Sequence, residues 1–490
     1  MIGRLLAGSV GSLIAALRPR THQRVLAIAV AASLALIANS ADAAGPRSID
    51  WEAITREATG FLSKYIQINT TNPPGNELAA AQFLKEKFLA DGIPAAVFES
   101  QPGRGIVAAR LRGVNQHHKT LILLSHMDVV PADAAEWQQP PFSGLVKDGE
   151  IWGRGALDDK GPGIVELMAM LALKRAGITL NRDVLFLATA DEEEGGRQGA
   201  GWVVEHQSDL IADAGYLLNE GGGIRIDKNG LAYYAVSTAE KAPLWLRLTA
   251  TGVSGHASTP PDQTAVTHLV GALNRLIDYV PPVKVVTAVQ NYYRVMAQLG
   301  RKPAEFEDLA KALRDPAFSR KFLAEPAQSA AVRNTIAPTV LSGSLKINII
   351  PASVFAEVDC RLLPGEDPNV VVKSLRDVIA DKTIKIDELL SFQSVSSPDK
   401  SGLMTAIQTL AKSHDDAPVV ATMLNGFTDS HYFRQKGLIA YGFMPLEFGE
   451  VQEKAHMVHG ANERISVKSL RDGIQRMVDL LRIFGGRGAR

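Results

Sequence analysis

The sequence predicts an α/β protein whose mainly parallel sheet is interrupted by an α+β insertion. In the first half, continuous apolar runs such as "TLILLS" and "DVLFLATA" alternate with helix-periodic segments. Strands buried on both faces of a mainly parallel sheet have this composition. From about Glu240, "PLWLRLTAT" and "FAEVDCRL" instead alternate apolar and polar residues, as in strands with one solvated face. A chain of 490 residues is also too long for a single core, so at least two domains are expected.

The elements of the first half follow one another in a regular order. A helical segment over 51–68 leads to the Pro/Gly loop "NTTNPPGNE", and "LAAAQFLKEKFLADG" then forms a helix that Gly92 closes. Next come the strands "GIVAARL" and "TLILLS", the helix "GIVELMAMLALKRAG", and the strands "DVLFLATA" and "AGYLLNE". The α/β pattern returns in "GLMTAIQTLAKSH", "GLIAYGFMP" and the helix "SVKSLRDGIQRMVDLLRIFG".

The returning pattern predicts that the larger domain is discontinuous. We expect its first part over residues 45–239 and its second part over 389–490. The insertion then covers 240–388 and includes helical material from about 299 to 325.

Residues 1–44 have the order of a secretory signal. Arg18, Arg20 and Arg24 precede the apolar run "VLAIAVAASLALIA", and Ala41 and Ala43 follow in an A-x-A pattern. The apolar run is shorter than the ~20 residues that span a bilayer. We therefore expect an exported protein, periplasmic or secreted, with membrane contact only if the segment stays uncleaved as an anchor.

Composition argues against two further features. A single cysteine, Cys360, allows no internal disulfide, so the stability must come from the core. The 52 basic and 52 acidic residues balance, and no Lys/Arg cluster supplies the basic face that a nucleic-acid partner normally requires. We expect no nucleic-acid partner.

Acidic and imidazole side chains recur at the ends of the predicted strands. "TLILLSHMD" places His126 and Asp128 just after a strand, and "GRGALDDKG" places Asp158 and Asp159 before a helix. After two further strands, "VLFLATADEEE" and "YLLNEGGG" supply Glu192, Glu193 and Glu220. Sites in open α/β sheets form outside the carboxyl ends of the strands, so these groups should converge.

Each of these pieces has a plainer explanation when it is taken alone: a structural histidine, a turn, or a solvated acidic run without the spacing of a calcium loop. Together they predict a metal site. Imidazole with carboxylate fits zinc, with cobalt or manganese as substitutes. Several carboxylates and two imidazoles suffice for two ions that share a bridging carboxylate and activate water. Of the neighbours Glu192 and Glu193, one can then bind metal while the other acts as the base.

Seven motifs resemble those of the co-catalytic zinc carboxypeptidase and aminoacylase family. They are, in chain order over about residues 51 to 485, "LLSHMDVVPA", "PPFSG", "IWGRGALDDKG", "ATADEEEGG", "LNEGG", "SGHAS" and "HGANERIS". The family includes acetylornithine deacetylase, succinyl-diaminopimelate desuccinylase and glutamate carboxypeptidase. The chain looks most similar to the carboxypeptidase S and N-fatty-acyl-amino-acid hydrolase branch. The resemblance implies a phosphorylase/hydrolase-like catalytic domain, interrupted by a lid and dimerisation domain with a ferredoxin-like sheet.

The resemblance also implies roles for single residues. One zinc would be bound by His126 and Glu220, the other by Glu193 and His459, and Asp158 would bridge them. Asp128 would hydrogen-bond the His126 ring and fix its tautomer, and Glu192 would be the general acid/base. The residues alone do not choose His459 over His456 or His431; only the motif "HGANE" decides this.

The lid is expected to contribute to substrate binding. His256 in "SGHAS" would steady the oxyanion, either in its own site or in the site of the partner subunit of a homodimer. Arg361 and Asn334 match lid positions that contact a substrate carboxylate in relatives, a task that suits the bidentate fork of arginine. His431 sits where relatives often carry an arginine near the substrate, so the side-chain preference does not follow from the family.

The sequence thus predicts a dinuclear zinc hydrolase that cleaves an amide or peptide bond next to a free α-carboxylate. Carboxypeptidase action on small peptides is the first predicted activity, and hydrolysis of N-acyl amino acids is the alternative. A homologue that only binds peptides is disfavoured, because all five ligand positions and Glu192 are filled.

Overall fold

The computed structural model describes residues 47–115, 117–226, 230, 232–344, 346–448 and 457–486. The predicted signal segment and His456 lie outside these residues. Residues from Ile49 onward form one compact unit. Among the described residues, no helix combines the length and the apolar character needed to span a bilayer.

The larger sheet has ten strands in the order β1-β2-β6-β3-β7-β17-β9-β8-β18, with β16 paired to β9. Its central strands β6, β3, β7 and β17 are parallel, while β1, β2 and β6 pair antiparallel. The strand bounds are β1 Ala95–Gln101, β2 Arg104–Leu111, β3 Thr120–His126, β6 Val184–Thr189, β7 Ala214–Asn219, β8 Gly223–Ile226, β9 Ala232–Glu240, β16 Val419–Leu424, β17 Ile439–Gly442 and β18 Glu447–Phe448. The predicted mainly parallel α/β sheet is confirmed.

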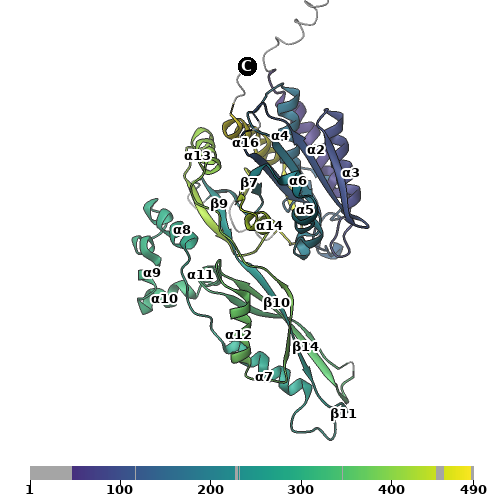
Figure 1. The fold of residues 1–490 in the computed structure, drawn as a ribbon, viewed down its shortest axis with the longest axis vertical. Coiled ribbons are helices and arrows are strands. Elements are labelled where there is room, and N and C mark those ends of the chain that lie inside the picture. The colour runs from purple at the N-terminus through teal and green to yellow at the C-terminus, as the bar shows by residue number, and fades with distance from the viewer. Residues whose placement is uncertain are drawn as a thin grey trace, which may run out of the picture. The chain divides into compact units, whose positions relative to one another are not determined.

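Both faces of this sheet are covered by helices, which explains the continuous apolar runs. In β3, Leu121 and Leu123 join the core on one face, whereas Ile122 and Leu124 join the core on the other. The first face carries α2 (Trp51–Gln67), α3 (Glu77–Ala90), α4 (Lys160–Arg175), α13 (Gly402–His414) and α16 (Val467–Gly485). The second carries α5 (Trp202–His206), α6 (Ser208–Ile211) and α14 (Ser430–Gln435) (Figure 1). Side chains on both faces of this sheet are therefore buried when the chain folds.

A small three-stranded sheet ties distant parts of the chain together. It consists of β4 (Leu145–Lys147), β5 (Glu150–Trp152) and β19 (Arg464–Ser466) in the order β19-β5-β4. The pairing of Ile465 with Ile151 places the "HGANERIS" segment beside the loop that precedes α4.

The second sheet is formed by the predicted insertion, with its last strand continuing to Ser391, just past the predicted boundary at 388. Its strands lie in the order β12-β14-β10-β15, and all their pairings are antiparallel. The bounds are β10 Ala242–Thr251, β12 Thr335–Ser342, β14 Ser353–Leu362 and β15 Lys385–Ser391. With α7 (Ala265–Asp278) and α12 (Pro368–Ile379), the chain order is β-α-β-β-α-β, which is the ferredoxin-like arrangement.

Apolar and polar residues alternate along the strands of this second sheet, because helices pack against only one of its faces. Leu244, Leu246 and Leu248 of β10 are buried in one core with Leu269 of α7 and Leu375 of α12. The residues between them are partly exposed. Cys360 is buried in the same core and is not in a disulfide.

Between α7 and β12 the chain forms the predicted helical material, which includes the stretch from about 299 to 325 and begins with α8 before it. Its elements are α8 (Thr287–Gln298), a 3-10 turn (Ala304–Asp308), α9 (Leu309–Ala312), α10 (Pro316–Leu323) and α11 (Pro326–Ala331). The short strands β11 (Gly255–His256) and β13 (Ile349–Ile350) pair with each other. The domain boundaries at 240 and 388 stay a prediction.

A buried ion pair lies where the chain passes between the two sheets. Glu240 ends β9 just before β10, and its Oε1 lies 2.7 Å from Nη1 of Arg434 on α14. The hydroxyl of Thr428 donates to its second oxygen at 2.9 Å. The returning segment after β15 adds a hydrogen bond from Ser394 Oγ to the Glu240 carbonyl. Both charged side chains are almost completely buried.

We expect Arg434→Met to lower the free energy of unfolding by about 3–5 kcal/mol, because it leaves the Glu240 carboxylate buried without its cation. Urea unfolding of both proteins measures this difference. The double variant Arg434→Met/Glu240→Gln removes the charge as well and should recover part of the loss. A single variant as stable as the wild type would contradict a stabilising role for the pair.

Candidate metal centre

The predicted ligand residues meet at the carboxyl edge of the central sheet. His126 is the last residue of β3, and Asp158 lies in the loop before α4. Glu193 belongs to the 3-10 turn Glu192–Glu194 after β6, and Glu220 follows β7 directly. His459 comes from the loop that precedes β19. Convergence at one edge follows from the parallel arrangement of β3, β6 and β7.

Asp158 divides its two carboxylate oxygens between two groups of side chains. Its Oδ1 lies 2.9 Å from Nε2 of His126, and its Oδ2 lies 3.2 Å from Nε2 of His459. Glu220 completes the first group, at 3.8 Å from His126 Nε2, and Glu193 completes the second, at 3.1 Å from His459 Nε2. Within each group the possible ligand atoms lie within 4.8 Å of one another. The geometry is that of two adjacent sites sharing one carboxylate.

The His126 ring is held from behind by Asp128. Its Nδ1 lies 3.0 Å from the Asp128 backbone carbonyl and 3.4 Å from the carboxylate oxygen Oδ1. A proton on Nδ1 therefore has an acceptor, and this tautomer turns the lone pair of Nε2 toward Asp158 and Glu220.

The Asp128 carboxylate also shapes the acidic turn. Its two oxygens accept hydrogen bonds from the backbone amides of Glu192 and Glu193, each at 3.1 Å. Asn72 donates a third hydrogen bond to it at 2.8 Å. Asp191, which opens the turn, has a φ of 71°, so the chain reverses sharply after β6. One buried side chain thus positions both glutamates.

Glu463 of the "HGANE" motif organises the loop that carries Asp158. Its carboxylate accepts from the backbone amides of Gly155, Leu157 and Asp158 at 2.7–3.0 Å. It also pairs with Arg154 at 2.8 Å, and the carboxylate is fully buried. The bridging position therefore depends on a residue 305 positions away in the chain.

Several carboxylates are crowded at this edge of the sheet, and they repel one another when no cation is bound. Burial, and then the neighbouring Glu220 carboxylate, raise the pKa of Glu192 well above its usual range. Burial and Asp158 do the same to the pKa of Glu220. The buried Oε1 of Glu193 has no hydrogen-bond partner among the described residues. Crowded carboxylates, an unpartnered oxygen and two imidazole nitrogens form a donor set that fits zinc-type cations.

The four predicted substrate-contacting residues lie outside these two groups. Arg361 on β14 is bonded through Nε and Nη2 to Asp359, and its guanidinium lies 4.9 Å from the Phe427 ring centroid. The Asn334 side chain accepts from the backbone amide of Leu363. These two lie close together, because Arg361 pairs with the residue after Asn334.

The two remaining histidines have different surroundings. His431 is buried, stacks on Phe392 at 3.5 Å, and has its pKa lowered to about 3 by burial. It is therefore neutral near pH 7. His256 is exposed on β11, and its hydrogen bonds are with Ser258. The substrate roles of all four residues stay predictions.

Three supporting residues were not predicted from the sequence. They are Asn72 and Arg104, which hydrogen-bond each other beside Asp191, and Glu463. Glu463 is part of the motif "HGANERIS", so that motif could have pointed to it. Asn72 lies in the Pro/Gly loop after α2, where nothing in the local pattern marks a contact with a residue 56 positions away.

Comparisons with known proteins agree with this geometry. A sequence profile described as Peptidase family M20/M25/M40 matches residues 122–483. The N-fatty-acyl-amino acid synthase/hydrolase PM20D1 of Homo sapiens is 28% identical, with 89% of this chain and 92% of that protein covered. The probable carboxypeptidase S-like 2 of Dictyostelium discoideum is also 28% identical, with 73% of this chain and 70% of that protein covered.

A solved structure shows the same fold. The M20 family metallo-carboxypeptidase Sso-CP2 from Sulfolobus solfataricus aligns with a TM-score of 0.70 at 22% identity, covering 88% of this chain and 99% of its own. With the profile matching most of the sequence, the chain belongs to peptidase family M20/M25/M40.

Proposed function

We propose that the protein is a dinuclear zinc hydrolase that cleaves an amide bond next to a free α-carboxylate. The observation that carries the proposal is the division of the Asp158 oxygens between the groups His126/Glu220 and Glu193/His459. A shared carboxylate with an imidazole and a further carboxylate on each side is the donor set of a two-ion hydrolytic centre.

His126 and Glu220 would hold one ion, Glu193 and His459 the other, and Asp158 both. When bound, such ions supply Lewis acidity and an activated water. Zinc suits the ligands best, and cobalt or manganese are the substitutes to expect.

Glu192 is the proposed general acid/base. Its backbone amide is bonded to Asp128, the residue is only 7% exposed, and burial raises its pKa. Such a carboxyl can hold a proton near neutral pH, although bound cations would lower its pKa again. It takes the proton of the attacking water and delivers it to the leaving amine.

Carboxypeptidase action on small peptides is the first proposed activity, and hydrolysis of N-acyl amino acids is the second. The names of the two curated relatives support one of these activities each. A peptide-binding protein without catalysis is disfavoured, because Glu192 and all five ligand positions are present.

We propose that Arg361 and Asn334 bind the substrate carboxylate. Arg361 already accommodates a carboxylate, that of Asp359, in the two-pronged geometry that a substrate would need. For His431, the stacked and neutral ring supports a role in shaping the site rather than in binding charge.

We further propose a homodimer formed through the lid. On α7, Val270 and Ile277 are 60% and 67% exposed, and on β12 Leu341 is 70% exposed. The β12 strand is an edge of its sheet. An exposed apolar helix beside an open strand edge favours association with a second copy. His256 would then act in the partner's site.

The N-terminal segment supports export to the periplasm or beyond, with membrane anchoring only if the segment is retained.

The metal assignment predicts about two zinc-type ions per chain and loss of activity on chelation, restored by added zinc. Glu193→Gln should lower the metal content, because it removes one ligand. Glu192→Gln should keep both ions yet lose about 10²–10⁴-fold in kcat, because the proton shuttle is gone. Metal analysis with steady-state kinetics checks both. The exposed neighbour variant Glu194→Gln serves as the control, and full activity of the chelated enzyme would contradict the assignment.

The carboxylate assignment predicts that Arg361→Gln costs about 2–5 kcal/mol in kcat/KM for a substrate with a free carboxylate. The same variant should hardly change the slow turnover of the corresponding carboxamide, because the charge that Arg361 binds is already missing. The test measures kcat/KM of the wild type and of Arg361→Gln for the free acid and for the carboxamide. Equal losses on acid and amide would show that Arg361 has another role.

Subunit mixing tests His256. His256→Ala and Glu192→Gln should each be nearly inactive as homodimers. After exchange of equal amounts, about a quarter of the sites should regain activity if His256 acts in the partner's site, because each heterodimer then has one intact site. Sedimentation of the wild type establishes the dimer. If mixing restores nothing while subunits exchange, His256 does not act in trans.

A further inference from the structure

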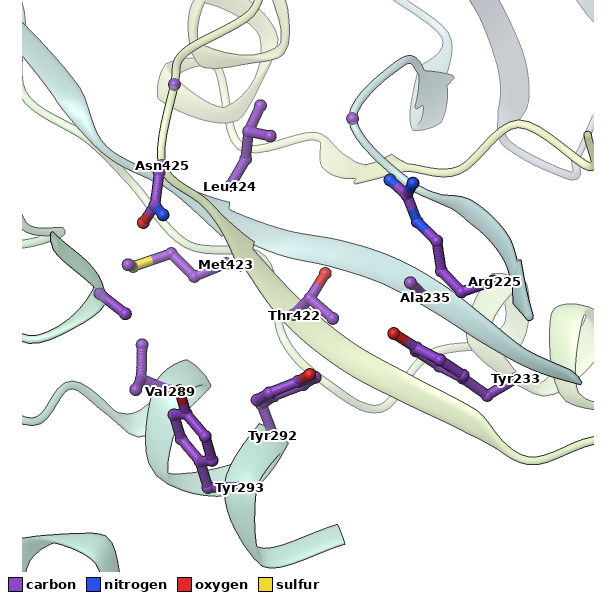
Figure 2. A pocket seen from close by; sticks show the side chains of 13 residues that line it. Arg225, Tyr233, Ala235, Val289, Tyr292, Tyr293, Thr422, Met423, Leu424 and Asn425 are labelled. Carbon is purple, nitrogen blue, oxygen red and sulfur yellow. The ribbon is translucent and has the colours of Figure 1, made fainter. Parts of the chain in front are cut away.

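A buried lysine lies where the chain passes from the larger sheet to the lid. Lys241 stands between β9 and β10 and is only 1% exposed. Its backbone amide donates to the carbonyl of Leu424, the last residue of β16 (Figure 2). Its Nζ donates to the carbonyl of Arg333 at 2.8 Å and to that of Ala330 in α11 at 3.0 Å. One residue thus connects the larger sheet with the segment that precedes β12.

The charge of Lys241 has no counterion of its own. Among the residues that the structure describes, no carboxylate lies within ion-pair distance of its Nζ, and its third N–H has no acceptor. A buried ammonium group without a carboxylate is costly. Burial and the nearby Arg361 lower its pKa to about 8, so the group still carries its charge near pH 7. A neutral donor could satisfy the two carbonyls, so the positive charge needs a separate explanation.

Lys241 lies close to the two residues that are proposed to bind the substrate carboxylate. Strand pairing places Arg361 opposite Pro243, two residues after Lys241. The segment that Lys241 holds continues directly into Asn334, whose side chain accepts from the Leu363 amide at 2.8 Å. Lys241 therefore supports Asn334 through the chain and influences Arg361 through its charge.

The charge of Arg361 is already balanced before a substrate binds. Its guanidinium is bonded to Asp359, and Nε1 of Trp245 donates to the same carboxylate at 3.0 Å. When a substrate carboxylate joins this pair, the site holds two carboxylates and one guanidinium, and the two anions repel each other. A second cation nearby restores neutrality. Lys241 is such a cation, since both Arg361 and Asp359 influence its pKa.

We propose that Lys241 is a specificity-determining positioning residue of the carboxylate site. Its ammonium group holds the segment that leads into Asn334, and its charge balances the substrate carboxylate that joins Arg361 and Asp359. The inference rests on the proposed hydrolysis next to a free carboxylate. It names the group that makes an anion preferable to a neutral amide at this position.

Matched acids and amides test the charge. The pairs are N-acetylalanine with its carboxamide and alanylalanine with its carboxamide, each given to the metal-loaded protein. Lys241→Met removes the charge and leaves a side chain of similar length. It should lower kcat/KM for the acid roughly tenfold or more, while kcat/KM for the amide stays within about threefold of the wild type. A segment that was merely loosened would affect both substrates alike.

Two further variants separate the charge from the fold. Lys241→Gln keeps a neutral donor near the Arg333 carbonyl and should lose the preference for the acid as Lys241→Met does; it also carries the test if Lys241→Met does not fold. Lys284→Met is the matched control. The Lys284 backbone amide donates to Val332 in the same segment, but its half-exposed side chain pairs with Glu366. Its loss should leave the ratio of acid to amide unchanged.

A double variant separates positioning from a general structural effect. In the Arg361→Gln background, Lys241→Met should lower kcat/KM for the acid by less than about threefold, because recognition of the carboxylate is already lost. A purely structural role would lower kcat/KM by the same factor in both backgrounds.

Binding supplies a readout that needs no turnover. The products alanine and alaninamide are titrated calorimetrically into the metal-loaded wild type, Lys241→Met and Lys284→Met. The wild type and Lys284→Met should bind alanine more tightly than alaninamide, and Lys241→Met should lose that difference.

The outcomes are separable. Loss of the acid preference in the Lys241 variants but not in Lys284→Met supports the inference. Equal losses on acid and amide, or an unchanged preference, overturn it. A wild type that hydrolyses neither acid contradicts the proposed hydrolysis, and product binding then decides the role of Lys241 by itself. A wild type that binds alanine no more tightly than alaninamide overturns that role as well.

Discussion

The carboxylate of Asp158 is the constraint on which the site depends. One oxygen faces His126 and the other faces His459, so two candidate ligand groups, the second of which includes a histidine from near the end of the chain, meet at a single side chain. Its place is set by Glu463, which gathers the backbone amides of the loop, while Asp128 places the acidic turn on the other side. The carboxylates crowded at this edge repel one another; protonation relieves part of that repulsion, and bound cations would relieve it further.

The fold supports this arrangement by holding the strand ends rigid. Strands β3, β6 and β7 are buried on both faces, so their carboxyl ends can shift little relative to one another. The parts that vary in such a scaffold are loops and insertions. Here α8, the first of the extra helices after α7, contributes Val289, Tyr292 and Tyr293 to the lining of a pocket against β9 and β16 (Figure 2).

Much of the fold was predictable because burial leaves a mark on composition. The apolar residues of β3 and β6 are continuous because helices cover both faces of these strands. Apolar and polar residues alternate along β10 and β14 because helices cover only one face. The acidic and imidazole residues of the site could be recognised because they directly follow these apolar strands. Strands β8, β9 and β16 were not predicted, because "AYYAVSTAE" and its neighbours are mixed in polarity and owe their conformation to pairing partners. Long-range supports such as Asn72 leave no local pattern at all.

The separation of 305 residues between Asp158 and Glu463 has a consequence for biosynthesis. A ribosome makes strands β3, β6 and β7, the acidic turn and Glu220 first, and the whole lid must then be translated before His459 and Glu463 appear. Until that moment the bridging loop lacks its buried acceptor and the second ligand group lacks its imidazole. A growing chain therefore lacks the complete set of candidate ligands, and completion of the site is tied to the end of translation rather than to the folding of its first half.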